Sequence, residues 1–113
     1  MMTLNSPEEL NQLPLDGEIL TLVRNEIIEP FGSITDATDF WRDVGTNLLL
    51  LENDDDLDAL AQSDSGLAFA LEYPEWSIDL PQGYQLSLSI YNDEGSGCYL
   101  ICPSHLINKD NSQ

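Results

Sequence analysis

Basic side chains are almost missing from this sequence. Its 113 residues contain 21 Asp and Glu but only three bases, Arg24, Arg42 and Lys109, which gives a formal net charge of -18 and a pI near 4.1. Most carboxylates must therefore lie in water or against a partner, without a basic neighbour in the chain. A surface of this sign excludes direct binding to nucleic acid and to anionic membranes, because both are negatively charged.

Long apolar runs and cysteines are also scarce. No stretch approaches the ~18 apolar residues of a membrane span, and residues 1–6 have neither the basic nor the apolar region of a secretory signal, so we expect a cytoplasmic protein. The two cysteines, Cys98 and Cys102, would lie about 13 Å apart in a strand, which is too far for a disulfide. A reducing compartment agrees with this spacing.

Hydrophobic residues make up 42% of the chain, so the acidity does not indicate disorder. The first part of the chain predicts two helices. Ser6, Pro7 and Glu9 form a capping-box start for a short helix over 7–13. A second, amphipathic helix begins near Asp16 and ends at Pro30, because its apolar residues recur at helical spacing. Single helical turns are expected over 37–43 and 57–61.

The remaining apolar segments predict a sheet. We expect strands at 46–52, 67–73, 84–90 and 98–102, with an extended connection or short edge strand within 75–83. The last two strands, joined by a turn at 92–97, should form an antiparallel hairpin. The sequence thus predicts one α+β domain over 1–113, with two N-terminal helices packed on one face of a three- to four-stranded, mainly antiparallel sheet and a polar tail from about residue 104.

A possible calcium loop is incomplete. Asp54, Asp56 and Asp58 match the first, third and fifth ligand positions of an EF-hand, but Ala59 and Ser65 stand where that loop needs Gly and Glu. A solvated acidic corner is the simpler interpretation of this cluster.

Other catalytic and metal motifs are missing as well. Cys98, Cys102 and His105 lack the spacing and the fourth ligand of a structural zinc site. The glycines of 95–97 lack the lysine and the following helix of a phosphate-binding loop. The many carboxylates offer too many pairs for any one pair to indicate acid–base catalysis. We therefore expect a non-enzymatic protein with no cofactor and no metal.

Two acidic stretches are the candidate binding surface: the corner of Glu52, Asp54, Asp55, Asp56 and Asp58, and the turn of Asp93 and Glu94. Trp41, Trp76 and Phe40 lie in irregular stretches near acids. They are either core residues or the aromatic anchors of a surface that binds a basic protein. In such an interface the acids accelerate encounter and the aromatic side chains hold the complex.

The total charge is close to that of a DNA segment of the protein's own length. A globule of this size is about 34 Å across, and duplex DNA carries about 20 charges over that length. In size, charge and α+β pattern, with acidic patches at 54–58 and 93–94, the chain resembles the small acidic DNA-mimic proteins that phages and conjugative elements use against host defence, the anti-CRISPR and antirestriction proteins. This resemblance implies binding to the nucleic-acid channel of a nuclease complex, which would block target DNA.

The sequence therefore predicts an inhibitor whose acidic face occupies a basic, DNA-binding surface of another protein. One alternative is an immunity or antitoxin-type protein, which would be acidic in order to bind a basic toxin. Another is a plain acidic interaction domain that relies on its aromatic side chains. The hairpin from Tyr84 to Cys102 could also pair through its edges in a homodimer.

Overall fold

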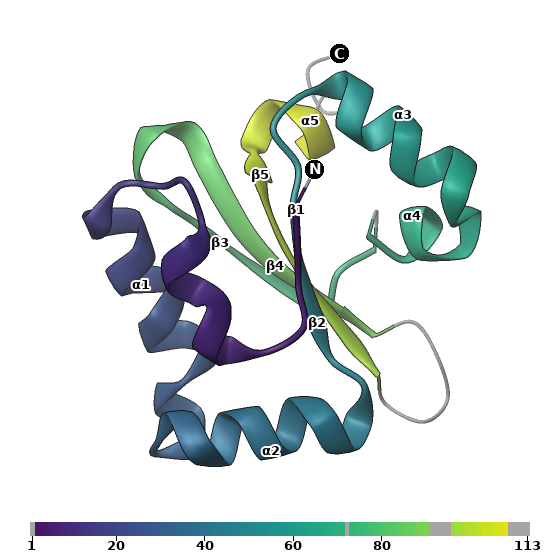
Figure 1. The fold of residues 1–113 in the computed structure, drawn as a ribbon. Helices are drawn as coiled ribbons and strands as arrows, with labels where there is room; N and C mark the ends of the chain where they lie inside the picture. Colours follow the sequence, from purple (N-terminus) through teal and green to yellow (C-terminus); the bar gives the residue numbers. More distant parts are fainter. Residues whose placement is uncertain (1, 72, 91–95, 109–113) are drawn as a thin grey trace.

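A computed structural model describes residues 2–71, 73–90 and 96–108, and it contains a five-stranded mixed sheet flanked by helices (Figure 1). The strands are β1 (Met2–Leu4), β2 (Asn47–Leu50), β3 (Trp76–Asp79), β4 (Tyr84–Ile90) and β5 (Gly97–Pro103). Their order is β1-β2-β5-β4-β3; β2 and β5 pair in parallel and the other neighbours pair antiparallel. The predicted α+β class with a mainly antiparallel sheet is confirmed, but the predicted number of three to four strands is wrong, because β1 pairs with β2 as a fifth strand.

Five α-helices and three 3-10 helices, labelled η, accompany the strands in the described residues. They are η1 (Pro7–Gln12), α1 (Gly17–Ile27), η2 (Glu29–Phe31), α2 (Ile34–Val44), α3 (Asp54–Ser63), α4 (Ser65–Leu71), η3 (Pro81–Gly83) and α5 (Ser104–Asn108). The predicted capping box at Ser6 and Glu9 is confirmed at the start of η1. None of these helices is long and apolar enough to cross a membrane.

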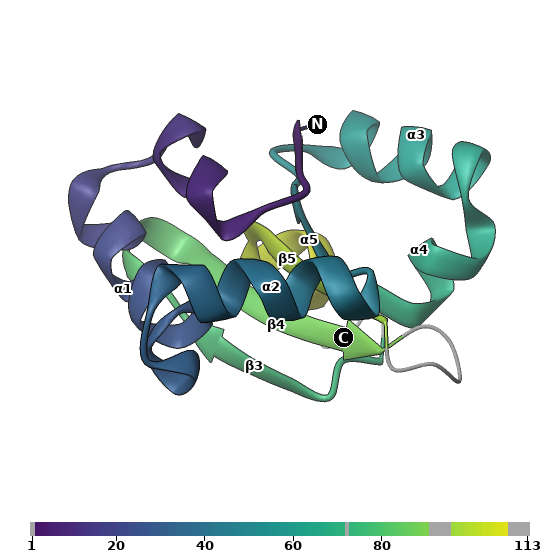
Figure 2. The same ribbon diagram turned by 60° about the horizontal axis from the view of Figure 1, so that its bottom comes forward.

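One face of the sheet is covered by η1, α1 and α2 and forms the larger core. The view in Figure 2 shows α2 lying across the strands, and both views place α1 on the side of the molecule opposite α3 and α4. Leu10, Val23 and Trp41 bring these helices onto the sheet, where they meet Leu48 and Ile101. Within this layer η1 and α1 correspond to the two predicted N-terminal helices, and α2 is a further helix.

The other face is covered by α3, α4 and α5, so the prediction of helices on one face only is wrong. The cause is that β2 and its neighbour β5 carry buried apolar side chains on both faces. Along the chain, Leu48 and Leu50 enter the first core, whereas Leu49 and Leu51 enter a second core with residues of α3, α4 and α5. A strand that is apolar on both faces requires cover on both faces.

Three further predictions are corrected. The expected strand at 67–73 is α4, because Leu67 and Leu71 are four residues apart and pack together into the second core. The single turns at 37–43 and 57–61 are parts of the longer helices α2 and α3. The polar tail begins with α5, whose Leu106 is buried; residues 109–113 lie outside the described residues.

The predicted hairpin pairing of β4 with β5 is confirmed, from Tyr84 opposite Pro103 to Ile90 opposite Gly97. The proposed edge-to-edge pairing of this hairpin in a homodimer is not confirmed, because neither strand has a free edge. β5 lies between β2 and β4, and β4 lies between β5 and β3. The open edges of the sheet are β1 and β3, and β3 is the short edge strand that the sequence indicated near Trp76.

Candidate acidic interaction surface

Every acid that the structure describes lies at the surface. Glu72, Asp93, Glu94 and Asp110 fall outside the described residues, which leaves 17 of the 21 acids, and none of these 17 is buried. The predicted second acidic stretch, Asp93 and Glu94, thus lies outside the described part of the chain. The fold keeps the described carboxylates in water rather than in its interior.

The predicted acidic corner forms the N-terminal turn of α3. The Asn53 side chain accepts a hydrogen bond from the Asp56 amide at 2.9 Å, and Asp56 Oδ2 accepts one from the Glu52 amide at 2.9 Å. The hydrogen bond from the Glu52 amide holds the pKa of the Asp56 carboxyl below its ordinary value. Acids in the first helical turn also face the positive end of the helix dipole. Asn53 therefore caps the helix and Asp56 holds the residues just before it, whereas Glu52, Asp55 and Asp58 are exposed.

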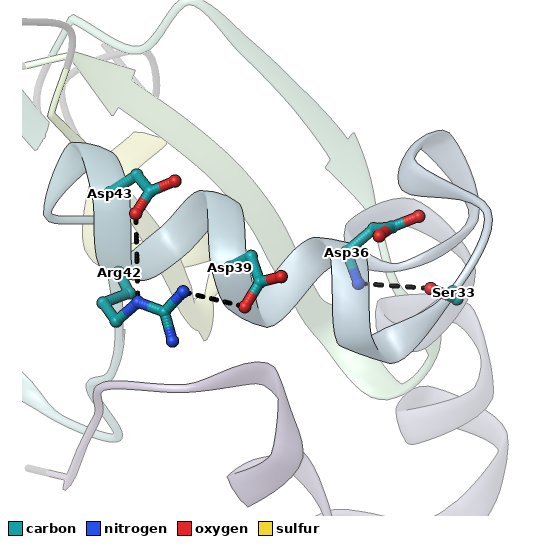
Figure 3. Close-up of polar contacts among 5 residues, drawn as sticks. All are labelled: Ser33, Asp36, Asp39, Arg42 and Asp43. Atoms are coloured by element: carbon teal, nitrogen blue, oxygen red, sulfur yellow. Dashed lines mark hydrogen bonds and ion pairs between the residues drawn. The ribbon is translucent and has the colours of Figure 1, made fainter.

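A second row of acids follows α2 in the opposite layer (Figure 3). Asp36 lies in its first turn, where its amide donates to Ser33 Oγ at 3.1 Å. Arg42 lies between Asp39 and Asp43, with nitrogen–oxygen distances of 2.9 and 3.8 Å. This exposed pairing stabilises the fold only weakly, but it places a positive charge within the row.

The two layers differ in their basic side chains. Arg42 lies on α2, and Arg24 lies on α1, where its Nη1 donates to Asn11 at 3.3 Å. From residue 43 to residue 108 the sequence contains 12 acids and no Lys or Arg. This stretch contributes α3, α4 and α5, so the α3 side of the molecule carries acids that no Lys or Arg of its own stretch neutralises.

The three aromatic residues that were candidate anchors differ in their exposure to solvent. Trp41 is 1% exposed and stacks on Tyr99 with ring centroids 5.5 Å apart, so it is a core residue and not part of a binding surface. Trp76 is half-buried on β3 and meets the edge of Tyr99 at 6.2 Å. Phe40 is 43% exposed on α2, beside Asp39, and contacts Phe31.

The sequence pattern did not indicate that two further aromatic residues are exposed. Phe69 on α4 and Tyr73 just beyond it are 65% and 68% exposed, and their ring centroids are 5.1 Å apart. The alternation of 67–73 suggested a strand, which would have buried Phe69 with Leu67 and Leu71. Helical spacing gives the opposite result, since the two leucines share one face and Phe69 points away from it.

No family model, curated protein or solved structure matches this chain. Its function is therefore argued from its own surface and charges.

Metal and nucleophile chemistry finds little support in the described residues. No group of three or more His, Cys, Asp or Glu side chains in ranges 2–71, 73–90 and 96–108 is placed to hold a metal ion. Burial raises the pKa of the Cys98 and Cys102 thiols from 9.0 to about 12. Both thiols are free and lie in the second core, so at neutral pH they are protonated and shielded. His105 is exposed on α5.

Proposed function

We propose that this protein is a non-enzymatic inhibitor that binds a basic, nucleic-acid-binding surface of another protein, as a DNA mimic of the anti-CRISPR or antirestriction kind. The observation that carries the proposal is that a chain of net charge -18 keeps every described carboxylate out of its interior. Acids held at the surface with so few bases repel one another and oppose folding. A basic partner would relieve that repulsion.

The size of the molecule agrees with this role. Its longest dimension is 42 Å and its radius of gyration is 13.5 Å. Duplex DNA of 42 Å length carries about 25 phosphate charges, which is the same order as the charge of this chain. The protein therefore offers a basic channel a comparable quantity of negative charge over a comparable length.

The α3 side is the face that we assign to the partner. Its acidic corner presents Glu52, Asp55 and Asp58 to solvent, and residues 43–108 supply no Lys or Arg to compete with those of a partner. Lysine and arginine side chains that normally hold DNA phosphates would bind these carboxylates instead. Inhibition would follow from occupancy alone, without a chemical step.

The first test removes charge from the proposed face. Glu52→Gln, Asp55→Asn and Asp58→Asn remove three charges, and Asp56 is left in place because its carboxylate accepts a hydrogen bond from the Glu52 amide. The matched control, Glu8→Gln, Glu18→Gln and Glu29→Gln, removes three exposed charges from η1, α1 and η2. An exposed ion pair contributes about 0.5 kcal/mol, so the loss of three should weaken binding by about 10-fold.

The partner for this test is captured from nuclease-treated host lysate on the immobilised protein and identified by mass spectrometry. Affinity is then measured across a salt series for the wild-type protein and both variants. The α3-side variant should show weaker binding and a shallower dependence on salt, while the control stays close to wild type. Unchanged affinity in the α3-side variant would remove this face from the proposal. Recovery of one small basic toxin would instead assign the immunity-protein alternative.

A further inference from the structure

The aromatic pair formed by Phe69 and Tyr73 is the most exposed large apolar feature among the described residues. The two side chains are 65% and 68% exposed, and their rings tilt at 47° with centroids 5.1 Å apart. Leu67 and Leu71 on the same helix are buried in the second core. The core thus holds α4 in place, and the pair projects from it into solvent.

The sequence on either side of the aromatic pair is acidic. Asp64 precedes α4, where its Oδ1 accepts a hydrogen bond from the Leu67 amide at 3.0 Å, and Glu75 is exposed two residues beyond Tyr73. The helix α3 packs on α4, and its acidic first turn lies at the end of α3 away from the short connection to α4. Because no Lys or Arg occurs between residues 43 and 108, the stretch that carries the pair has no cation of its own to place on the ring faces.

We propose that the aromatic pair is a binding site for an arginine side chain of a basic partner protein. This inference rests on the proposed function and names the anchor within the same α3-side surface. A guanidinium is planar and weakly hydrated, so it stacks on aromatic faces better than an ammonium does. The nearby carboxylates supply the opposite charge. The acids attract any cation, whereas the pair selects arginine.

Charge argues against a second copy of this chain as the occupant. Two copies would each bring a net charge of -18, and that repulsion opposes association at low salt. The chain's own described arginines, Arg24 and Arg42, lie in the opposite layer and contact Asn11 and Asp39 there. A foreign basic segment is the occupant with complementary charge.

The inference is tested with two labelled synthetic peptides of equal charge, one of alternating Gly and Arg and one of alternating Gly and Lys. Their affinities are measured by fluorescence anisotropy for the wild-type chain and for the double variant Phe69→Ser, Tyr73→Ser. Both side chains are exposed, so the fold should survive, and circular dichroism checks this. Phe40→Ser is the matched control, since Phe40 is another exposed aromatic residue, in the layer that contains the arginines.

The wild-type protein should bind the arginine peptide about 3-fold more tightly than the lysine peptide. The double variant should lose this preference while it keeps the lysine-peptide affinity, and Phe40→Ser should keep both. A preference for arginine that survives in the double variant, or is absent in the wild type, would overturn the inference. So would a dimer of the wild-type chain, detected by sedimentation, that the double variant abolishes. The lysine-peptide affinity and its salt dependence report the acidic surface separately, so failure of the proposed function would be visible independently.

Discussion

The pKa values of the Cys98 and Cys102 thiols depend on where the fold places these side chains. They occupy the same face of β5, and both thiols lie in the second core. Burial disfavours the thiolate and raises the pKa of each thiol from 9.0 to about 12. Burial also raises the pKa of Tyr99, and the Glu26 carboxylate raises it further. The neutral forms of these groups belong to the folded state.

Alkaline pH should therefore destabilise the protein. Below pH 9 both states keep the thiol protons; between pH 9 and 12 the unfolded chain loses them before the folded chain does. The free energy of unfolding should fall as pH rises through this window, by up to about 1.4 kcal/mol per thiol and pH unit. Urea unfolding at several pH values measures the fall. It should be smaller in the Cys98→Ala, Cys102→Ala variant, and an equal fall would contradict the assignment.

Capping at Asn53 is a second prediction at this scale. Asn53→Ala removes the acceptor of the Asp56 amide at the start of α3, so the variant should lose about 1 kcal/mol of unfolding free energy. Asn25→Ala, an exposed change within α1, is the matched control and should lose nothing. Urea unfolding distinguishes the two. Equal stabilities of the two variants would mean that Asn53 does not cap α3.

Single residues could be predicted from the sequence where their structure depends on neighbouring residues. Ser6, Glu9 and the four buried leucines of 48–51 were predicted, because capping and burial depend on neighbouring residues. Trp41 lies in an acid-rich stretch and nevertheless enters the core, since it lies with Ala37 on the buried face of α2. The aromatic pair was missed because its exposure depends on whether α4 is a helix or a strand.

Among the elements, α4 has a sequence pattern that fits both a strand and a helix. Leu67, Phe69 and Leu71 alternate as in a strand, but Leu67 and Leu71 also match helical spacing. Asp64 caps the segment by accepting from the Leu67 amide, and the second core needs a helix over β5. The strand β1 presents the opposite difficulty. Its three residues gain their structure from pairing with β2, a contact across more than 40 residues that local patterns do not encode.

Gly66 tests the helical assignment of α4, and Gly45, which lies at the C-terminal end of α2, is its contrast. Gly66 lies in α4 without a positive φ, and an added Cβ would meet only Asp64 Oδ1, at 3.6 Å. Gly66→Ala should raise the unfolding free energy by about 0.5–1 kcal/mol, because alanine favours a helix. Gly45 has a φ of +75° and a Cβ there would lie 3.3 Å from Ser96 Oγ. Gly45→Ala should cost at least about 1 kcal/mol. Thermal or urea unfolding checks both signs, and a loss at Gly66 would count against α4.

For the molecule as a whole, two helical layers on one sheet spread the acids over both sides. The η1, α1 and α2 layer contains Arg24 and Arg42, whereas the stretch that forms the other layer has no Lys or Arg. This difference could not be predicted from the sequence, because it required the knowledge that α3 and α4 cover the opposite face. The charge itself was evident from the composition alone.

Added salt should stabilise the folded protein, since screening weakens the repulsion among its surface carboxylates. A gain of about 1 kcal/mol would raise Tm by roughly 4 °C in a chain of this length. Thermal unfolding at low and high sodium chloride measures this rise. The variant Glu8→Gln, Glu18→Gln, Glu29→Gln should show a smaller rise because it carries three fewer charges. A Tm that does not change with salt would mean that repulsion contributes little.

Mutual exclusion with DNA tests the proposed mimicry most directly. The partner captured on the immobilised protein is challenged with increasing duplex DNA at constant ionic strength, with an uncharged polymer as the control. Displacement of the partner by duplex DNA, with salt lowering its affinity for both ligands, is the expected result. A partner that binds this protein and duplex DNA at the same time would contradict DNA mimicry.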